Sequence, residues 1–175
     1  MELFIKQDSA DLISLALELF AVYVRASQRN IVTLNSMSAS ALNSIKLQHV
    51  PLLIKTTSDI VDGKEVHLQS STGSPYTIMQ EIASACYLED VIFGKKDSNQ
   101  RLEISTLLEQ AQRLSAAELT EMVNTHIGQS RMFLVGLNVT VADIVVFAHI
   151  AHHFSALPDF EKIQLPHAFR WLDHI

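Results

Sequence analysis

Three histidines near the end of the chain are the first residues whose types and spacing could do chemistry. His149 and His153 lie four residues apart with His152 between them, and on a helix this spacing places two imidazoles on one face. No carboxylate or cysteine accompanies them at the spacing of a metal site. Such a pair more often packs or faces solvent, so we expect no metal site and no metal cofactor.

A second candidate for chemistry is Cys86, the single cysteine of the chain. A lone cysteine excludes an internal disulfide and fits a reducing compartment. Because Cys86 lies in an apolar helical stretch, the sequence favours a buried, inert thiol over a nucleophile. Phosphate-binding loops, nucleotide fingerprints and basic stripes are absent from the sequence.

Composition narrows the classes of function further. The 175 residues carry a net charge of −6, with 48% hydrophobic and 18% charged residues. This is the profile of a folded protein, and its acidity disfavours direct binding of DNA or RNA. No signal peptide is visible, and the apolar run 12–24 is too short to cross a bilayer. We therefore expect a cytoplasmic protein.

The polar interruption in FLVGLNVTVADIVVF, residues 133–147, predicts the start of a helix. Thr140 and Asp143 have the T-x-x-D spacing of a capping box, with Asp in place of the commoner Glu. Val139 before the cap and Ile144 after the first turn predict a hydrophobic staple. The Asn138-Val139-Thr140 glycosylation sequon is explained better by this cap in a cytoplasmic protein.

The predicted elements change character along the chain. The first half predicts strands and helices in the order β-α-β-β-β-α, with strands at 2–6, 30–36, 50–56 and 65–69 and helices at 8–26 and 74–88. After the polar connection 95–100 only helices are predicted, at 102–114, 119–127, 140–156 and from Pro166 onward. We expect an α+β protein with subdomains 1–92 and 93–175.

Several motifs bear a resemblance to one family. FLVGLNVTVADIVVF resembles the helix-capping signature of the glutathione-transferase C-terminal domain. VPLLIK resembles the strand of that family that carries a cis-proline, here Pro51, and VHLQSSTGSPYTIMQEIA resembles the strand, turn and helix that follow. The match is strong over 115–175, weaker over 1–90, and departs from the pattern at 36–49. It implies a glutathione-transferase-like fold, with a thioredoxin-like N-terminal subdomain and an all-helical C-terminal one.

The resemblance also identifies candidate glutathione-binding residues. Gln69 and Ser70 stand where the family holds the γ-glutamyl group at a helix N-terminus, although the sequence favours ordinary capping as the role of Ser70 and Ser71. Of the Tyr, Ser or Cys residues that stabilise the glutathione thiolate, only Ser9 is eligible. We therefore expect no catalytic residue and no cofactor, and treat a glutathione-binding transferase as the alternative.

The segment LPHAFRWLDHI resembles the last helix of one branch of the family. This branch comprises the domains attached to methionyl- and glutamyl-prolyl-tRNA synthetases, to synthetase-complex interacting proteins, to elongation-factor exchange subunits and to the tRNA import protein of apicomplexan parasites. Domains of this branch do no chemistry but pair as homodimers or heterodimers. The resemblance implies that Arg170 contacts an acidic or aromatic group of a partner; a local pair with Asp173 is the alternative.

Helical spacing assigns the faces of this last segment. One face is predicted to pack on the bundle and one to point away, with Trp171 at the flank; the packed residues are Leu165, Ala168, Phe169, Leu172 and Ile175, and the outward residues are Pro166, His167, Arg170, Asp173 and His174. The resemblance thus implies a scaffold domain of a tRNA-binding protein associated with the aminoacyl-tRNA synthetase complex, with tRNA bound by a further, C-terminal domain. An elongation-factor exchange subunit is another alternative.

Overall fold

The computed structural model describes residues 1–6, 12–27, 33–37, 51–61, 64–72 and 74–175. Internal contacts divide the chain into two units, Met1–Cys86 and Tyr87–Ile175. The division falls after Cys86, whereas the sequence analysis places it after residue 92. The residues between these two positions include a short helix, α4 (Glu89–Ile92), which belongs to the second unit.

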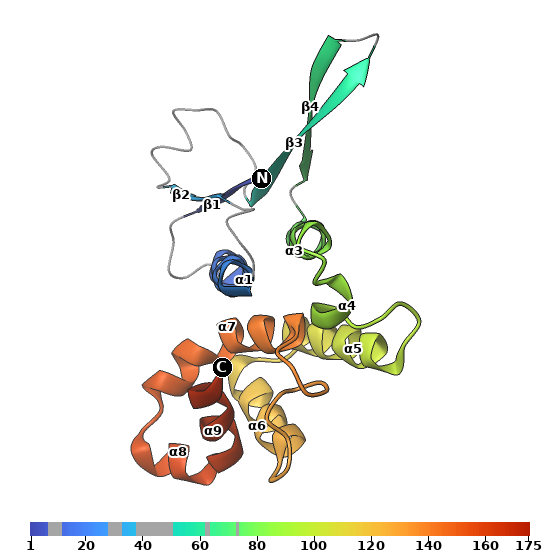
Figure 1. The fold of residues 1–175 in the computed structure, drawn as a ribbon. Coiled ribbons are helices and arrows are strands. Elements are labelled where there is room, and N and C mark those ends of the chain that lie inside the picture. The colour runs from blue at the N-terminus through green and yellow to red at the C-terminus, as the bar shows by residue number, and fades with distance from the viewer. Residues whose placement is uncertain (7–11, 28–32, 38–50, 62–63, 73) are drawn as a thin grey trace. The chain divides into compact units, whose positions relative to one another are not determined.

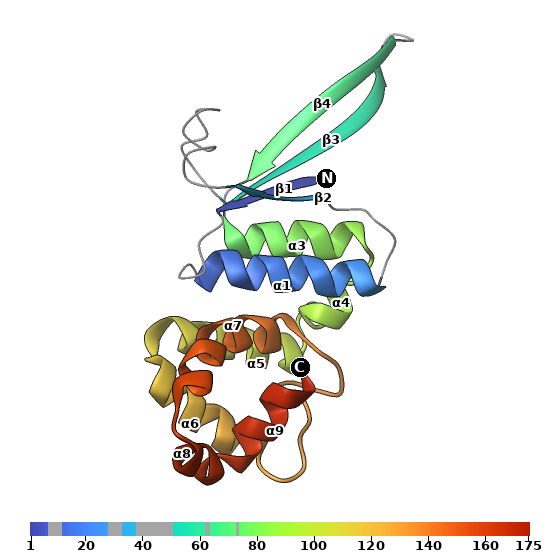
Figure 2. The ribbon, with the colours of Figure 1, turned by 90° about the vertical axis from the view of Figure 1, so that its left-hand side faces the viewer.

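In its described residues the first unit has a four-stranded sheet and two helices. Its elements are β1 (Glu2–Lys6), α1 (Leu12–Ser27), β2 (Thr33–Met37), β3 (Leu52–Val61), β4 (Lys64–Thr72) and α3 (Pro75–Ala85). The strand order is β2-β1-β3-β4, with β1 parallel to β2 and the other pairs antiparallel. Helices α1 and α3 lie side by side against the sheet (Figure 2) and bury Phe20 and Ile78. This order of elements is the one predicted for the first half.

The β3–β4 hairpin is longer than the sequence predicts. Strand β1 pairs with β3 only at Leu52–Ile54, while the β3–β4 register continues to Val61 opposite Lys64 (Figure 1). The sequence ended the first strand early because Thr, Ser and Asp follow residue 56; backbone pairing extends it regardless of side-chain type. The predicted turn residues Asp62 and Gly63 lie outside the described residues.

The second unit is a bundle of helices around α7 (Figure 1). Besides α4 it contains α5 (Asn99–Arg113), α6 (Ala116–Ile127), α7 (Val141–Ala156), α8 (Asp159–Gln164) and α9 (Pro166–His174). Helices α5 and α6 pack on α7, and α9 packs on α6. Helix α7 is apolar nearly all round and buried accordingly. None of the helices in the described ranges is both long and apolar enough to cross a membrane.

Helices α4 and α8 were not predicted. Helix α8 has six residues between Pro158 and Pro166, and none of its side chains is buried. A helix of this length shows little of the periodicity that marks a longer one. The sequence analysis therefore took Pro158 only as the end of α7, although proline also suits the start of the next helix.

Candidate functional site

The carboxylate of Asp143 is the polar centre of the second unit. The side chain is completely buried at the start of α7. Oδ2 accepts hydrogen bonds from the backbone N–H of Thr140 at 2.9 Å and from its hydroxyl at 3.0 Å. Oδ1 accepts from the backbone N–H of Leu134 at 2.8 Å and from the indole N–H of Trp171 at 3.1 Å. Asp143 thus joins the α6–α7 loop, α7 and α9.

Burial and hydrogen bonding act on Asp143 in opposite directions. Removal from water raises the pKa of its carboxyl, whereas the hydrogen bonds from Leu134, Thr140 and Trp171 favour the charged form and lower it. The effect of burial is the larger. Asp143 and Thr140 lie as a capping box requires, with Val139 half-buried and Ile144 buried. Nothing in the sequence indicates that this carboxylate also binds Trp171.

The prediction that Trp171 lies at the flank of the last helix, within a partner interface, is wrong. Trp171 is only 1% exposed and is a core residue, tilted against Phe147 with ring centroids 6.4 Å apart. Ala168, one turn earlier, is equally buried, whereas Phe169 is 53% exposed. The buried face of α9 is therefore centred on Ala168 and Trp171. Trp171 can be buried because its indole N–H has a buried acceptor, which an aliphatic side chain does not need.

Arg170 is exposed, as predicted, but its guanidinium is directed at its own chain. Nη2 donates to the carbonyl oxygens of Gly128 at 2.7 Å and Arg131 at 3.1 Å, and Nη1 donates to that of Gln129 at 3.4 Å. These carbonyls lie at and just beyond the C-terminus of α6, where helical carbonyls lack partners and a cation is favoured. Neither the predicted partner contact nor the alternative pair with Asp173 describes this arrangement.

The other predicted interface residues lie around the same helix. The backbone N–H of His167, like that of Ala168, donates to Oδ1 of Asn124 on α6, at 2.9 and 3.1 Å respectively. The imidazole of His174 lies 5.4 Å from the ring of Phe133. Asp173 and His174 are exposed and His167 is half-buried, so these side chains can be reached from solvent.

Large apolar side chains are exposed on α8 and α9. Phe160 and Ile163, one turn apart on α8, are 64% and 76% exposed. Phe169 on α9 is exposed on one side and lies 6.1 Å from the ring of Phe154 on the other. We call Phe160, Ile163 and Phe169 the α8–α9 apolar surface. Side chains of this size normally contact another surface when several are exposed on neighbouring elements.

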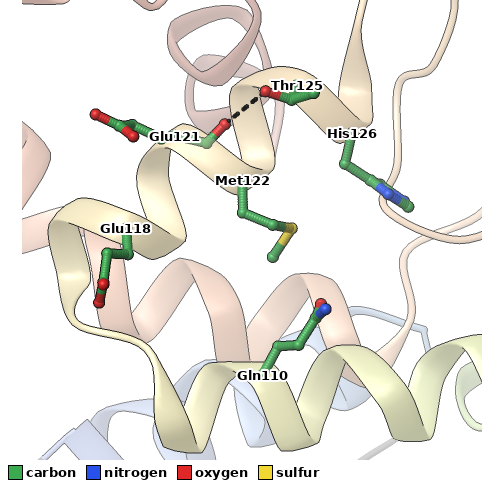
Figure 3. Close-up of a pocket in the computed structure, with 6 residues that line it drawn as sticks. All are labelled: Gln110, Glu118, Glu121, Met122, Thr125 and His126. Atoms are coloured by element: carbon green, nitrogen blue, oxygen red, sulfur yellow. Dashed lines mark hydrogen bonds between the residues drawn. The ribbon is translucent and has the colours of Figure 1, made fainter.

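An open groove lies between α5 and α6 in the second unit. It has a volume of about 480 Å³ and is lined by Gln110 of α5 and, on α6, by Glu118, Glu121, Met122, Thr125 and His126 (Figure 3). Nothing in the sequence analysis predicted it, because its residues come from two helices with ordinary amphipathic patterns. Its acidic rim was nevertheless visible as S-x-x-E at Ser115–Glu118, followed by a further glutamate.

Comparison with protein families decides what the fold is. Residues 79–175 match the glutathione S-transferase C-terminal domain, which is more than half of the chain. The chain belongs to that family. The family resemblance of the sequence motifs is thereby confirmed, and the transferase-like fold with a thioredoxin-like first unit is confirmed by similar solved structures.

Solved structures across the glutathione S-transferase fold resemble the whole chain. A glutathione S-transferase 1-6 from Anopheles dirus species B is 15% identical, with a TM-score of 0.66, covering 99% of this chain and 87% of that one. Human glutathione-S-transferase T1-1 is 15% identical, with a TM-score of 0.63, covering 99% and 81%. A structure of yeast aminoacyl-tRNA synthetase sub-complexes is 15% identical, with a TM-score of 0.56, covering 98% and 84%. No curated protein sequence is similar enough to count as a relative.

The two candidates for binding the γ-glutamyl group of glutathione lie within β4. Gln69 and Ser70 are paired there with Thr56 and Lys55. Strand β4 continues to Thr72, and α3 begins at Pro75 with Ser74 as its N-cap, as the predicted helix start at residue 74 requires. Pro51 is half-buried at the start of β3. Its bond to residue 50, and Ser9, lie outside the described residues.

The histidine pair makes a main-chain contact. Nδ1 of His149 lies 2.8 Å from the carbonyl oxygen of Val145 within α7. Within the ranges that the structure covers, no group of three or more His, Cys, Asp or Glu side chains is arranged to hold a metal ion.

Proposed function

We propose that this chain is a non-catalytic, cytoplasmic assembly domain of the aminoacyl-tRNA synthetase system. It pairs with a second copy or with other glutathione-transferase-like domains. The observation that carries the proposal is the α8–α9 apolar surface, together with the reachable side chains of His167, Asp173 and His174. A rim of polar groups around exposed aromatic and aliphatic side chains is the ordinary anatomy of a protein–protein interface.

Two similarities bear on the choice of the aminoacyl-tRNA synthetase system. The sequence LPHAFRWLDHI, which forms α9, resembles the last helix of synthetase-associated domains. The similar yeast structure is, by its description, a set of binary sub-complexes of an aminoacyl-tRNA synthetase complex. At 15% identity the second similarity speaks for the fold alone, so the α9 motif carries the specific part of the proposal.

Arg170 enters this proposal in a changed role. Its guanidinium holds the end of α6, so we propose that it supports the surface from beneath. Substitution of Arg170 by Glu would therefore disturb the bundle as well as any partner contact. A variant that tests assembly alone has to change a side chain that is mostly exposed to solvent. Ile163 on α8, which is 76% exposed, is such a side chain.

Ile163→Glu is that variant. We expect wild-type protein to capture synthetases from a cytosolic extract, read by mass spectrometry, and Ile163→Glu to lose them. Leu137→Glu is the matched control, because Leu137 is 88% exposed on the loop before α7 and outside the α8–α9 apolar surface. Capture that survives Ile163→Glu, or no synthetase with wild type, would contradict the proposal. Capture of elongation-factor subunits instead would favour the exchange-subunit alternative.

A glutathione-binding transferase is the second candidate, and one observation favours it. Ser74 is exposed at the N-cap of α3 and its side chain makes no capping hydrogen bond, so its hydroxyl and the helix N-terminus can accept a carboxylate. Calorimetric titration with glutathione tests this. Saturable binding lost in Ser74→Ala but kept in Ser70→Ala would support the transferase; no heat with wild type would remove it.

A further inference from the structure

The groove between α5 and α6 extends along both helices. A second hollow shares Gln110 and His126 with the first and continues along α5 past Leu102, Glu103 and Thr106. The two hollows together form one trough, which we call the α5–α6 trough. In Figure 3 Met122 points from α6 toward α5, with Gln110 facing it from below. A trough of this kind between two helices can receive a third helix.

The trough has apolar side chains for an incoming segment. Leu102 is 68% exposed on the α5 side, and Met122 is half-buried between the helices. Methionine adapts its shape to different apolar side chains, because it is unbranched and polarisable. An aliphatic residue of a partner would therefore find contacts at both positions.

Carboxylates line the trough, and Arg131 lies beside one of them. Its lining includes the carboxylates of Glu103, Glu118 and Glu121, and no Lys or Arg. Glu103 is neutralised by Arg131 at 3.1 Å, and Glu118 accepts from Ser115. The carboxylate of Glu121 has no hydrogen bond or ion pair within the described part of the chain. Glu118 and Glu121 lie one helical turn apart, which matches two basic residues one turn apart on a facing helix.

We propose that the α5–α6 trough binds a cationic amphipathic helix of a protein partner. Its apolar side chains would pack on Leu102 and Met122, and its Lys or Arg side chains would face Glu118 and Glu121. A second copy of this chain fits less well, because each copy carries a net charge of −6. The inference does not rest on the proposed assembly function, since the α8–α9 apolar surface uses other residues.

The test uses the full chain labelled with ¹⁵N and a peptide of about 15 residues, Leu and Lys in amphipathic helical order. We expect chemical-shift changes confined to α5 and α6, and a Kd that rises roughly tenfold in Glu121→Lys. The control is Asp90→Lys, the same charge change on an exposed α4 residue outside the trough; its Kd should stay close to that of wild type. A peptide with Glu in place of Lys should not bind.

Three results would overturn the proposal: equal weakening by Asp90→Lys and Glu121→Lys, shift changes centred on α8 and α9, or no binding by wild type. Circular dichroism of each variant verifies that the fold is kept. Ile163→Glu, which tests the assembly proposal, should leave the Kd for the Leu/Lys peptide unchanged, so failure of one proposal is distinguishable from failure of the other.

Discussion

Helices α6 and α7 both begin with a hydroxyl residue whose backbone N–H donates to a carboxylate three residues later. In α6 this pair is Ser115 and Glu118, 2.9 Å apart and exposed to solvent. In α7 it is Thr140 and Asp143, also 2.9 Å apart but fully buried. The local geometry is the same and the surroundings differ.

The difference shows what burial adds to a local motif. Hydrogen bonds from Ser115 lower the pKa of Glu118, which is exposed to solvent. Burial raises the pKa of Asp143, whose second oxygen must then find donors inside the protein, from Leu134 and Trp171. A capping carboxylate at the surface closes one helix end, whereas a buried one also fixes the elements around it.

The largest expected effect comes from removing the buried carboxylate. Asp143→Ala leaves three buried N–H donors without an acceptor and should lower the free energy of unfolding by on the order of 3 kcal/mol or more. Glu118→Ala should have only a small fraction of that effect, because water replaces the lost acceptor. Denaturant midpoints of the two variants measure the difference. Equal midpoints would show that burial of the box has no special energetic weight.

Asp143→Asn should have an intermediate effect of about 1–3 kcal/mol. The amide oxygen can still accept from Leu134 and Trp171, but the amide NH₂ then faces the N–H of Thr140, so one donor stays unsatisfied. Trp171→Phe in the Asn background separates the contributions, since it removes the indole donor. If Asp143→Asn is as stable as wild type, the hydrogen-bond directions assigned to this carboxylate are wrong.

Removal of the α6 end contact should cost less. Arg170→Gln is expected to destabilise the fold by about 1 kcal/mol, because the three carbonyls it binds can be partly hydrated. Asp173→Asn, on the same exposed side of α9, is the control and should leave the midpoint of urea unfolding unchanged. Full stability of Arg170→Gln would return Arg170 to the role of a free interface residue.

The smallest expected effect is on the pH dependence of stability, which should have opposite signs for Asp143 and Glu118. Because the folded-state pKa of Asp143 is raised above its ordinary 3.8, folding takes up a proton there, and the stability contributed by this group falls as pH rises above 3.8. The pKa of Glu118 is lowered from 4.5, so its contribution is present above 4.5 and lost as pH falls.

Unfolding free energies of Asp143→Asn and Glu118→Gln, measured against wild type from below pH 3.8 to above pH 4.5, should therefore change in opposite directions. Parallel trends for the two variants would contradict the assignment of burial as the dominant influence on Asp143.

The sequence predicted correctly those structural features that depend on residues close together in the chain. The order of strands and helices, the long helices of the second unit and the Thr140–Asp143 spacing all depend on neighbouring residues. The position of Trp171 depends on a buried acceptor 28 residues earlier in the chain. The contacts of Arg170 join residues about 40 positions apart. A helical wheel shows neither, because it ranks α9 side chains by polarity and not by their partners.

The surroundings of the glutathione candidates also depend on contacts between distant residues. The sequence motif LQSS could be aligned with the family, but whether Ser70 ends a strand or begins a helix is decided by the pairing of β4 with β3. Ser74 and Pro75 carried the local signal for the helix start. The α5–α6 trough needed the packing of two helices and was beyond reach from either one alone.

Helices α6 and α9 hold each other's ends. Asn124 of α6 accepts from the first N–H groups of α9, and Arg170 of α9 donates to carbonyls of the residues that follow α6. Each helix therefore stabilises the chain at one end of the other. Trp171 of α9 also donates to Asp143, so a force applied to the outer side of α9 is transmitted to the first turn of α7. A chain truncated before α9 would lose that helix, its contacts with the residues after α6 and its hydrogen bond to the first turn of α7.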